Sequence, residues 1–180
     1  MLYSNRLRLR AAEREDIPMF VRWLNDPEVR QHLLMGYPFS LAHEENWFQG
    51  MVDRDKSEQA LVIEARSDNG WKSLGNTSFM HIDWVNRSAE VGIVIGEKDE
   101  WGKGYGRDTM KLMLRHGFNN MNLNRVSLRV HSDNQRGIKA YEHAGFIHEG
   151  VQREGVYRGG KYLDVLLMSV LRSEWRDSDF

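Results

Sequence analysis

A short glycine-rich segment is the part of the chain whose residue types and spacing best support chemistry. Residues 101–107 read Trp-Gly-Lys-Gly-Tyr-Gly-Arg and lie between an apolar alternating segment and an amphipathic one. Glycines at alternate positions permit positive φ and let main-chain N–H groups converge without a Cβ in the way. The helix expected to follow adds unpaired N–H groups and the positive end of its dipole. The segment therefore predicts a binding site for a phosphate or pyrophosphate, with Lys103 and Arg107 at its rim.

Other phosphate-binding loops fit this segment less well. A Walker A loop requires Ser or Thr after its Gly-Lys pair, and here Gly104 follows Lys103. A dinucleotide-binding fingerprint that starts at Gly102 requires glycine at its sixth position, which is Arg107. The glycine loop of protein kinases spans a hairpin, not a strand-to-helix turn. A plain turn that caps a helix is the simplest alternative, and three alternating glycines with two cations disfavour it.

A second polar pair follows in the segment Val130-His131-Ser132-Asp133-Asn134 and the residues after it. Asn134 and Tyr141 are seven residues apart, which places both on one face of a helix with Ile138 between them. A polar group at each end of an apolar floor suits an extended arm that ends in a thiol. Taken alone, Asn134 is most simply a helix cap and Tyr141 a half-buried core tyrosine.

Periodic patterns indicate the elements that must position these residues. The sequence predicts strands at residues 7–11, 60–64, 73–81, 89–95, 126–130, 146–151 and 162–171. It predicts helices that start near Asp16, span 44–52, run from the glycine-rich segment to Phe118, and span 134–143. The resulting order is β-α-α-β-β-β-α-β-α-β-β, a mixed α/β arrangement with an antiparallel start and one parallel crossover.

Composition limits the classes of protein to consider. The chain has 180 residues and a net charge of −1, so we expect one domain over residues 1–180 and no nucleic-acid partner. It contains no cysteine, which excludes disulfides, thiolate metal sites and cysteine nucleophiles. Its histidines show no ligand spacing, and no metal is predicted. The first ten residues lack the apolar core of a signal peptide, and no run is long enough to span a bilayer. We therefore expect a cytoplasmic protein without a membrane partner.

The motifs together resemble the GNAT family of N-acetyltransferases. Gly104 and Gly106 match the small positions of its Gln/Arg-x-x-Gly-x-Gly/Ala signature, while Trp101 replaces the Gln/Arg. The pattern from Asn134 through Tyr141 to Gly145-Phe146 resembles its second motif, with Gly137 where Ser or Ala is usual. The Trp101 departure and the end of the chain, residues 160–175, resemble the branch of ribosomal-protein and spermidine N-acetyltransferases. The resemblance implies one α/β (α+β) domain with a mixed, mostly antiparallel twisted sheet of about seven strands and about four helices, splayed between the fourth and fifth strands.

The resemblance also implies a cofactor and roles for particular residues. It implies that acetyl-CoA is the donor, that the glycine-rich segment surrounds its pyrophosphate, and that an amine attacks the thioester directly. Tyr141 would protonate the leaving thiolate, and the main-chain N–H of Val94 would stabilise the oxyanion, with a bulge permitted at Gly92. The implied cofactor-binding residues are Ile93, Val94, Ile95, Gly102, Lys103, Gly104, Tyr105, Gly106, Arg107 and Asn134.

The general base and the acceptor stay open at this point. Glu90 is the candidate base, with His81, Asp83 or an ordered water relay as rivals. We expect the acceptor to be a small-molecule amine, such as a polyamine, or a protein N-terminal amine. It should contact three segments: residues 32–40, residues 83–87 and the turn near Tyr157. The carboxylates of Glu44, Glu45 and Asp83 should attract it. A non-catalytic acyl-CoA sensor is the alternative function, and a homodimer is compatible with the resemblance.

Overall fold

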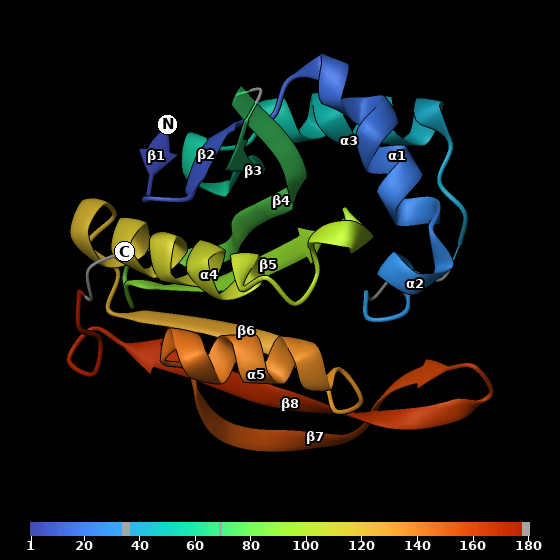
Figure 1. Cartoon of the computed structure of the whole chain (residues 1–180). Helices are drawn as coiled ribbons and strands as arrows, with labels where there is room; N and C mark the ends of the chain where they lie inside the picture. The colour runs from blue at the N-terminus through green and yellow to red at the C-terminus, as the bar shows by residue number, and fades with distance from the viewer. Residues whose placement is uncertain (34–36, 69, 178–180) are drawn as a thin grey trace. The chain divides into compact units, whose positions relative to one another are not determined.

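The strands of the protein form one mixed sheet, described here from a computed structural model that covers residues 1–33, 37–68 and 70–177. The sheet has eight strands in the order β1-β2-β3-β4-β5-β6-β8-β7 within these residues, and its neighbouring strands are mostly antiparallel (Figure 1). Strands β5 and β6 form the expected parallel pair. The fold is the GNAT-like α/β arrangement that the sequence predicts.

The bounds of the elements differ from expectation mainly at their ends. The strands are β1 Leu2–Tyr3, β2 Leu7–Ala11, β3 Leu61–Ser67, β4 Gly70–Asp83, β5 Ser88–Ile95, β6 Arg125–His131, β7 Ile147–Arg158 and β8 Lys161–Leu171. The α-helices are α1 Ile17–Asn25, α2 Pro27–Arg30, α3 Leu41–Val52, α4 Tyr105–Arg115 and α5 Gln135–Ala144. Short 3-10 turns span Arg14–Asp16, Lys56–Glu58 and Lys98–Glu100, and a π-helical turn spans His116–Asn120. The expected counts of seven strands and four helices therefore each fall one short, because β1 and α2 are too short to show a period.

The chain divides into two compact units, which are described separately. The first holds Met1–Met80 and Gly92–Tyr105, and the second holds His81–Val91 and Gly106–Phe180. No helix in the described part of the chain is both long and apolar enough to cross a membrane.

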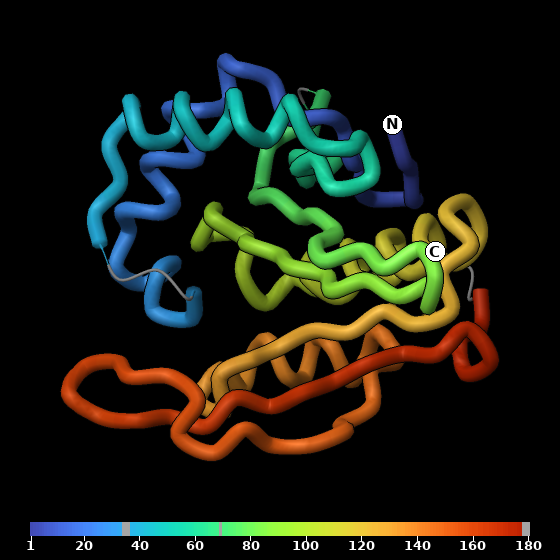
Figure 2. The backbone as a smooth tube through the Cα atoms, turned by 180° about the vertical axis from the view of Figure 1, so that it is seen from behind, coloured from blue at the N-terminus to red at the C-terminus, as the bar shows by residue number. Residues whose placement is uncertain are grey.

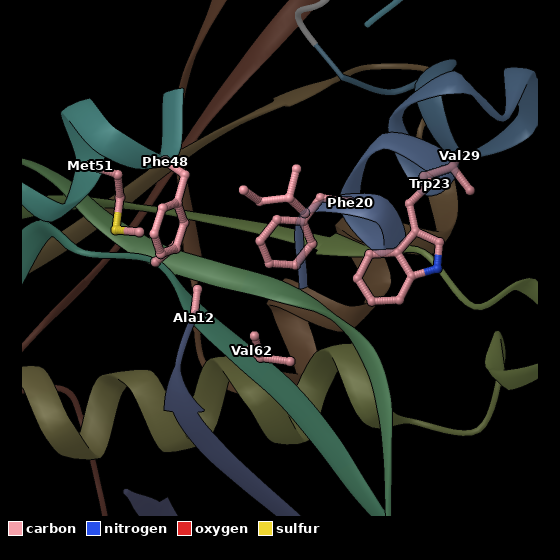
Figure 3. Close-up of a cluster of buried hydrophobic side chains, with 9 residues drawn as sticks. Ala12, Phe20, Trp23, Val29, Phe48, Met51 and Val62 are labelled. Carbon is pink, nitrogen blue, oxygen red and sulfur yellow. The ribbon is translucent and has the colours of Figure 1, made fainter. Parts of the chain in front are cut away.

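In the first unit, helices α1 and α3 pack on strands through an aromatic core. Helix α1 begins after Asp16 with Pro18 in its first turn and turns a stripe of apolar side chains inward. Phe20 and Trp23 of α1 lie with Phe48 of α3 above Val62 of β3 (Figure 3). The other buried members of this cluster are Ala12, Ile17, Val29, Met51 and Ala60, with Trp101 and Val94 packed against it. The core therefore extends to the residues that lead into the glycine-rich segment.

In the second unit, helix α5 lies across strands β6 and β8 (Figures 1 and 2). Its first turn is capped by Asn134, and it ends at Gly145, whose φ of 104° is accessible mainly to glycine. Met168 and Val170 of β8 are buried on the inner face of this layer, as are the alternating apolar residues of β6. Strand β7 is the edge of the sheet, and a bulge interrupts its pairing with β8 between Gln152 and Val156.

Candidate active site

The glycine-rich segment forms an open turn that leads directly into helix α4. Gly102 and Gly104 have φ of 77° and 85°, in the left-handed region that favours glycine, and α4 begins at Tyr105. A Cβ built on Gly102 or on Gly106 would meet no atom within 4 Å. Alternating left-handed residues before a helix make a concave array of main-chain N–H groups, which is a common anion-binding arrangement. The turn therefore has the shape and the polarity that a pyrophosphate requires.

The two cations of this turn are each paired with a carboxylate. Lys103 Nζ lies 2.9 Å from Glu100 Oε2, and Glu100 also binds Lys72 at 2.7 Å. Hydrogen bonds from Lys72 and then Lys103 hold the pKa of Glu100 below its ordinary value. Arg107 pairs with the buried Asp108 at 2.8 Å. Because these charges are largely compensated, the main chain is the stronger source of attraction for an anion at this turn.

A residue that the sequence reasoning missed also contacts the turn. Arg6 donates a hydrogen bond of 2.8 Å from Nη2 to the carbonyl of Lys103. Its guanidinium also lies 4.6 Å from the centre of the Tyr105 ring. Arg6 precedes strand β2 and is 97 residues away from Lys103 along the chain. No local sequence signal marks such a distant contact.

The end of strand β5 is fixed to the turn and to strand β4. Trp101, which replaces the usual Gln/Arg, donates from its indole Nε1 to the carbonyl of Ile95 at 2.8 Å. Gly96 and Glu97 both donate their main-chain N–H to the carbonyl of Leu74, at 2.8 and 3.1 Å. Two donors on one carbonyl are the hydrogen-bond pattern of a β-bulge, here at Gly96 and Glu97 just after β5 ends.

Strand β4 approaches β5 closely beside Val94. A Cβ on Gly75 would lie 1.8 Å from the carbonyl oxygen of Val94, so only glycine fits at that position. The hydroxyl of Thr77 donates to the carbonyl of Gly92 at 2.7 Å, so Gly92 also turns toward β4. Since main-chain groups alternate along a strand, those of Ile93 and Ile95 point to the opposite edge of β5. This alternation favours Ile93 and Ile95, more than Val94, as the residues with main-chain groups on that edge.

The parallel ladder between β5 and β6 is short. It consists of the pairs Ser88–Arg125, Ala89–Val126 and Glu90–Ser127, and both strands continue beyond it. This is the position at which the fold was expected to splay. Glu90 lies at the end of the ladder, where its Oε1 accepts a hydrogen bond of 2.9 Å from Arg129 Nε.

Asp83 and His81, the other candidate bases, lie at the end of strand β4. Asp83 accepts hydrogen bonds from the main chain and the side chain of Asn86, at 2.8 and 2.7 Å, which hold its pKa below the ordinary value. Its carboxylate thus stabilises the turn and is poorly suited to accept a proton. His81 is exposed and has a left-handed φ of 53°.

The second motif lies on helix α5, as the sequence predicts. The amide oxygen of Asn134 accepts the N–H of Gly137 at 2.9 Å, so Asn134 caps the helix. A Cβ on Gly137 would lie 2.6 Å from Asn134 Nδ2, so a larger residue there would require the capping side chain to shift. Tyr141 packs edge-on against Phe146, with ring centres 6.0 Å apart. Burial raises the pKa of Tyr141 to about 12, so its phenol keeps its proton at neutral pH.

One carboxylate of the expected acceptor region is buried. Glu44 is 4% exposed and lies on the face of α3 that carries Phe48 and Met51 toward the core. Desolvation raises its pKa above the ordinary value, and no hydrogen bond to its side chain is recorded within residues 1–33, 37–68 and 70–177. Glu45 is exposed, and positions 34–36 of the expected acceptor loop lie outside the described residues. A buried, ionisable group without such a partner is a candidate for ligand recognition.

The predicted site residues fall into two groups by unit. The first unit brings together Ile93, Val94 and Ile95 with residues 102–105, through the bonds of Trp101 and the bulge. The second unit holds Gly106 and Arg107 at the start of α4, with Glu90, Asn134 and Tyr141.

Comparison with known proteins decides the family. The profile described as an acetyltransferase (GNAT) domain matches residues 6–147, which is most of the chain. The chain belongs to the GNAT acetyltransferase family. As a GNAT protein it is an acyl-CoA-dependent N-acyltransferase, and its donor is acetyl-CoA.

Several relatives place this GNAT chain more closely. It is 29% identical over 177 residues to "Uncharacterized N-acetyltransferase p20" of Bacillus licheniformis, with 97% of each chain covered. It is 34% identical over 130 residues to "Putative ribosomal N-acetyltransferase YdaF" of Bacillus subtilis, covering 72% of this chain and 67% of the relative. The crystal structure of spermidine N-acetyltransferase from Vibrio cholerae in complex with CoA and spermine superposes with a TM-score of 0.85 and 28% identity. That match covers 93% of this chain and 96% of the other.

Proposed function

We propose that the protein acetylates a primary amine by direct attack of the amine on the thioester of acetyl-CoA. The open turn at Gly102–Gly106 is the observation that carries this proposal. Its two left-handed glycines, the open space beside Gly102 and Gly106, and the start of α4 make main-chain donors accessible to a pyrophosphate. The main-chain groups of Ile93 and Ile95, on either side of Val94, would pair with the pantetheine arm along the edge of β5, and Asn134 would line it.

Tyr141 is the proposed general acid. A thiolate that leaves the tetrahedral intermediate needs a proton, and a phenol with a pKa of about 12 carries one throughout the physiological range. The absence of cysteine supports direct transfer, because the chain lacks the nucleophile of a thioester intermediate. A sensor that only binds acyl-CoA has no use for this phenol, so Tyr141 separates the enzyme from that alternative.

Glu90 is the proposed general base. An alkylammonium has a pKa near 10.4, so it must lose a proton before it can attack. Since Arg129 holds one oxygen of Glu90, we propose that the carboxylate acts through an ordered water. Glu90→Gln should then lower kcat most at low pH, where fewer acceptor amines are neutral.

A polyamine is the acceptor that we propose. Buried Glu44 supports it, because a carboxylate in a low-dielectric setting attracts a cation more strongly than one in water. The relative crystallised with CoA and spermine supports the same class of acceptor. The match to a putative ribosomal N-acetyltransferase favours a protein N-terminal amine as the second candidate.

The deciding assay measures acetyl transfer from acetyl-CoA to each class of acceptor. Spermidine, spermine and a peptide with a free N-terminus are compared by thiol release and by the mass of the product. We expect a gain of one acetyl group on the polyamines, with kcat/KM at least tenfold above that of the peptide. Faster acetylation of the peptide would replace the polyamine by the second candidate. Binding of acetyl-CoA without transfer to any amine would favour the sensor.

A further inference from the structure

Arg6 contacts the glycine-rich turn at two points, although it lies 97 residues before Lys103 in the sequence. Its Nη2 donates to the carbonyl of Lys103 at 2.8 Å, and its guanidinium lies over the ring of Tyr105 at 4.6 Å. We propose that Arg6 is a positioning residue that orients the Lys103–Gly104 peptide, so that the N–H of Gly104 faces the pyrophosphate of acetyl-CoA. This inference rests on the proposed function, which places the pyrophosphate at the same turn.

The geometry of a trans peptide carries the argument. The C=O and N–H of one peptide unit point in opposite directions, and the chain contains no cis peptide bond among its described residues. Arg6 holds the carbonyl of Lys103, so the N–H of Gly104 must point away from Arg6. One side-chain contact therefore decides on which side of the turn this donor is available.

The turn needs such a constraint because glycines flank the peptide units on both sides of Lys103. Gly102 and Gly104 have no Cβ, so positive and negative φ are both accessible to them and their peptide units can rotate at little steric penalty. A turn that samples several orientations must pay this conformational entropy when it binds an anion. A contact that selects one orientation beforehand removes that penalty.

The contact with Tyr105 extends the constraint to the helix. Tyr105 is the first residue of α4, and Gly104 lies between it and Lys103. Arg6 therefore holds the chain on both sides of Gly104. A planar guanidinium can donate within its plane and stack with its face at the same time, which a lysine ammonium cannot do.

Arg6 is itself well placed to act as a support. Its carbonyl accepts the main-chain N–H of Arg66 at 3.0 Å, next to the β2–β3 ladder. The following residue, Leu7, is fully buried in β2 and pairs with Ala65. The backbone of Arg6 is thus fixed by the sheet. Its side chain can therefore restrain the turn that it contacts.

Arg66 provides a matched control. It is an exposed arginine beside Arg6, and its guanidinium lies over the ring of Trp71 at 5.5 Å. Arg66→Met removes the same charge and a similar cation–π contact without touching the turn. Arg6→Met removes both contacts, and Arg6→Lys keeps the charge but only one of them.

The experiment compares two acetyl donors, acetyl-CoA and S-acetylpantetheine, which lacks the pyrophosphate. We expect Arg6→Met to raise KM for acetyl-CoA about tenfold, the lower end of what one charge-assisted hydrogen bond contributes. Its kcat and its kcat/KM for S-acetylpantetheine should stay within twofold of the wild type, as should every parameter of Arg66→Met. Arg6→Lys should recover less than half of the loss.

Four results would overturn the inference. A loss of equal size with both donors would mean that Arg6 only supports the fold, and full recovery by Arg6→Lys would mean that only its charge matters. Wild-type KM for acetyl-CoA in Arg6→Met would remove the role altogether. If the wild type itself shows no preference for acetyl-CoA over S-acetylpantetheine, the turn does not bind the pyrophosphate. Both the proposed function of the turn and the role of Arg6 would then be refuted.

Discussion

Replacing Gly106 by alanine should stabilise the protein and weaken its binding of acetyl-CoA. Gly106 is the second residue of α4, and a Cβ added there meets no atom within 4 Å. Alanine in a helix is favoured over glycine by about 0.5 to 1 kcal/mol, because the unfolded chain loses conformational freedom. For a chain of this size the gain corresponds to a rise in Tm of about 1 to 4 °C.

The same methyl group should obstruct the ligand. In the proposed complex the pyrophosphate approaches the main chain of the turn, and the space beside Gly106 is open in the protein. The GNAT signature admits alanine as well as glycine at this position, so the variant tests whether this chain needs the closer approach that glycine allows. A Cβ in that space lengthens charge-assisted hydrogen bonds, and we expect the Kd of acetyl-CoA to rise about tenfold. At a ligand concentration of 100 times the wild-type Kd, the wild type gains about 2.7 kcal/mol and the variant about 1.4 kcal/mol.

The two effects have opposite signs, so the order of melting temperatures should reverse. Without ligand Gly106→Ala melts above the wild type, and with acetyl-CoA in excess it melts level with it or below it. Gly50→Ala is the control, because Gly50 is an exposed glycine of helix α3 with equally open space around its Cβ. It should raise Tm with and without ligand. Equal gains from acetyl-CoA in Gly106→Ala and the wild type would refute the close approach of the pyrophosphate to this turn.

Three further predictions test other parts of the site. Tyr141→Phe should lower kcat by about 100-fold or more while calorimetry shows an unchanged Kd for acetyl-CoA; a normal kcat would remove Tyr141 as the acid. Gly75→Ala should lower Tm by about 2 to 12 °C, because its Cβ would lie 1.8 Å from the Val94 carbonyl, and an unchanged melt would contradict that contact. Glu44→Gln should raise Tm at pH 8 and leave it unchanged near pH 4: the folded protein raises the pKa of Glu44, so stability is lost as pH rises and the buried carboxyl ionises. A gain of the same size at both pH values would show that charge burial is not the cause.

Local patterns predicted the elements that contain the site better than they predicted its supports. The glycine-rich turn and helix α5 were found from residue type and spacing, because each is determined by neighbours in the sequence. The ends of the strands were not, and β7 reaches Arg158 where the pattern ended at Val151. Its second half pairs with β8 across a bulge and is largely exposed, so it shows no apolar period.

The supports that were missed all depend on contacts between distant parts of the chain. Nothing near Arg6 in the sequence indicates the carbonyl that it binds, and nothing near Gly75 indicates the approach of Val94. Trp101 could be recognised as a departure from the family signature, but only the structure connects its indole to Ile95. The bulge pattern at Gly96 and Glu97 was missed for the same reason, because the carbonyl that both N–H groups bind belongs to the distant Leu74.

Charged residues just before the glycine-rich turn make contacts that hold its backbone in one conformation. Glu97 binds Arg22 and the indole of Trp23, while Lys98 binds Asp26 at 2.8 Å. Two positions after Lys98, Glu100 binds both Lys72 and Lys103. Single ion pairs at a surface contribute little stability, because solvent and salt weaken them.

Their effect on the turn is larger than their effect on stability. Three of the four side chains in residues 97–100 are held: Glu97 by α1, Lys98 by Asp26 and by Glu28 of α2, and Glu100 by Lys72 of β4. This segment is therefore constrained from several directions at once. Arg6 then fixes the next peptide units from the side of β2. Glycines let the backbone of the turn adopt the conformation in which N–H groups converge. The surrounding contacts hold the turn in that conformation and so strengthen its binding of an anion. Substitutions in the segment at 97–100 should therefore raise the Kd of acetyl-CoA while they leave Tm nearly unchanged.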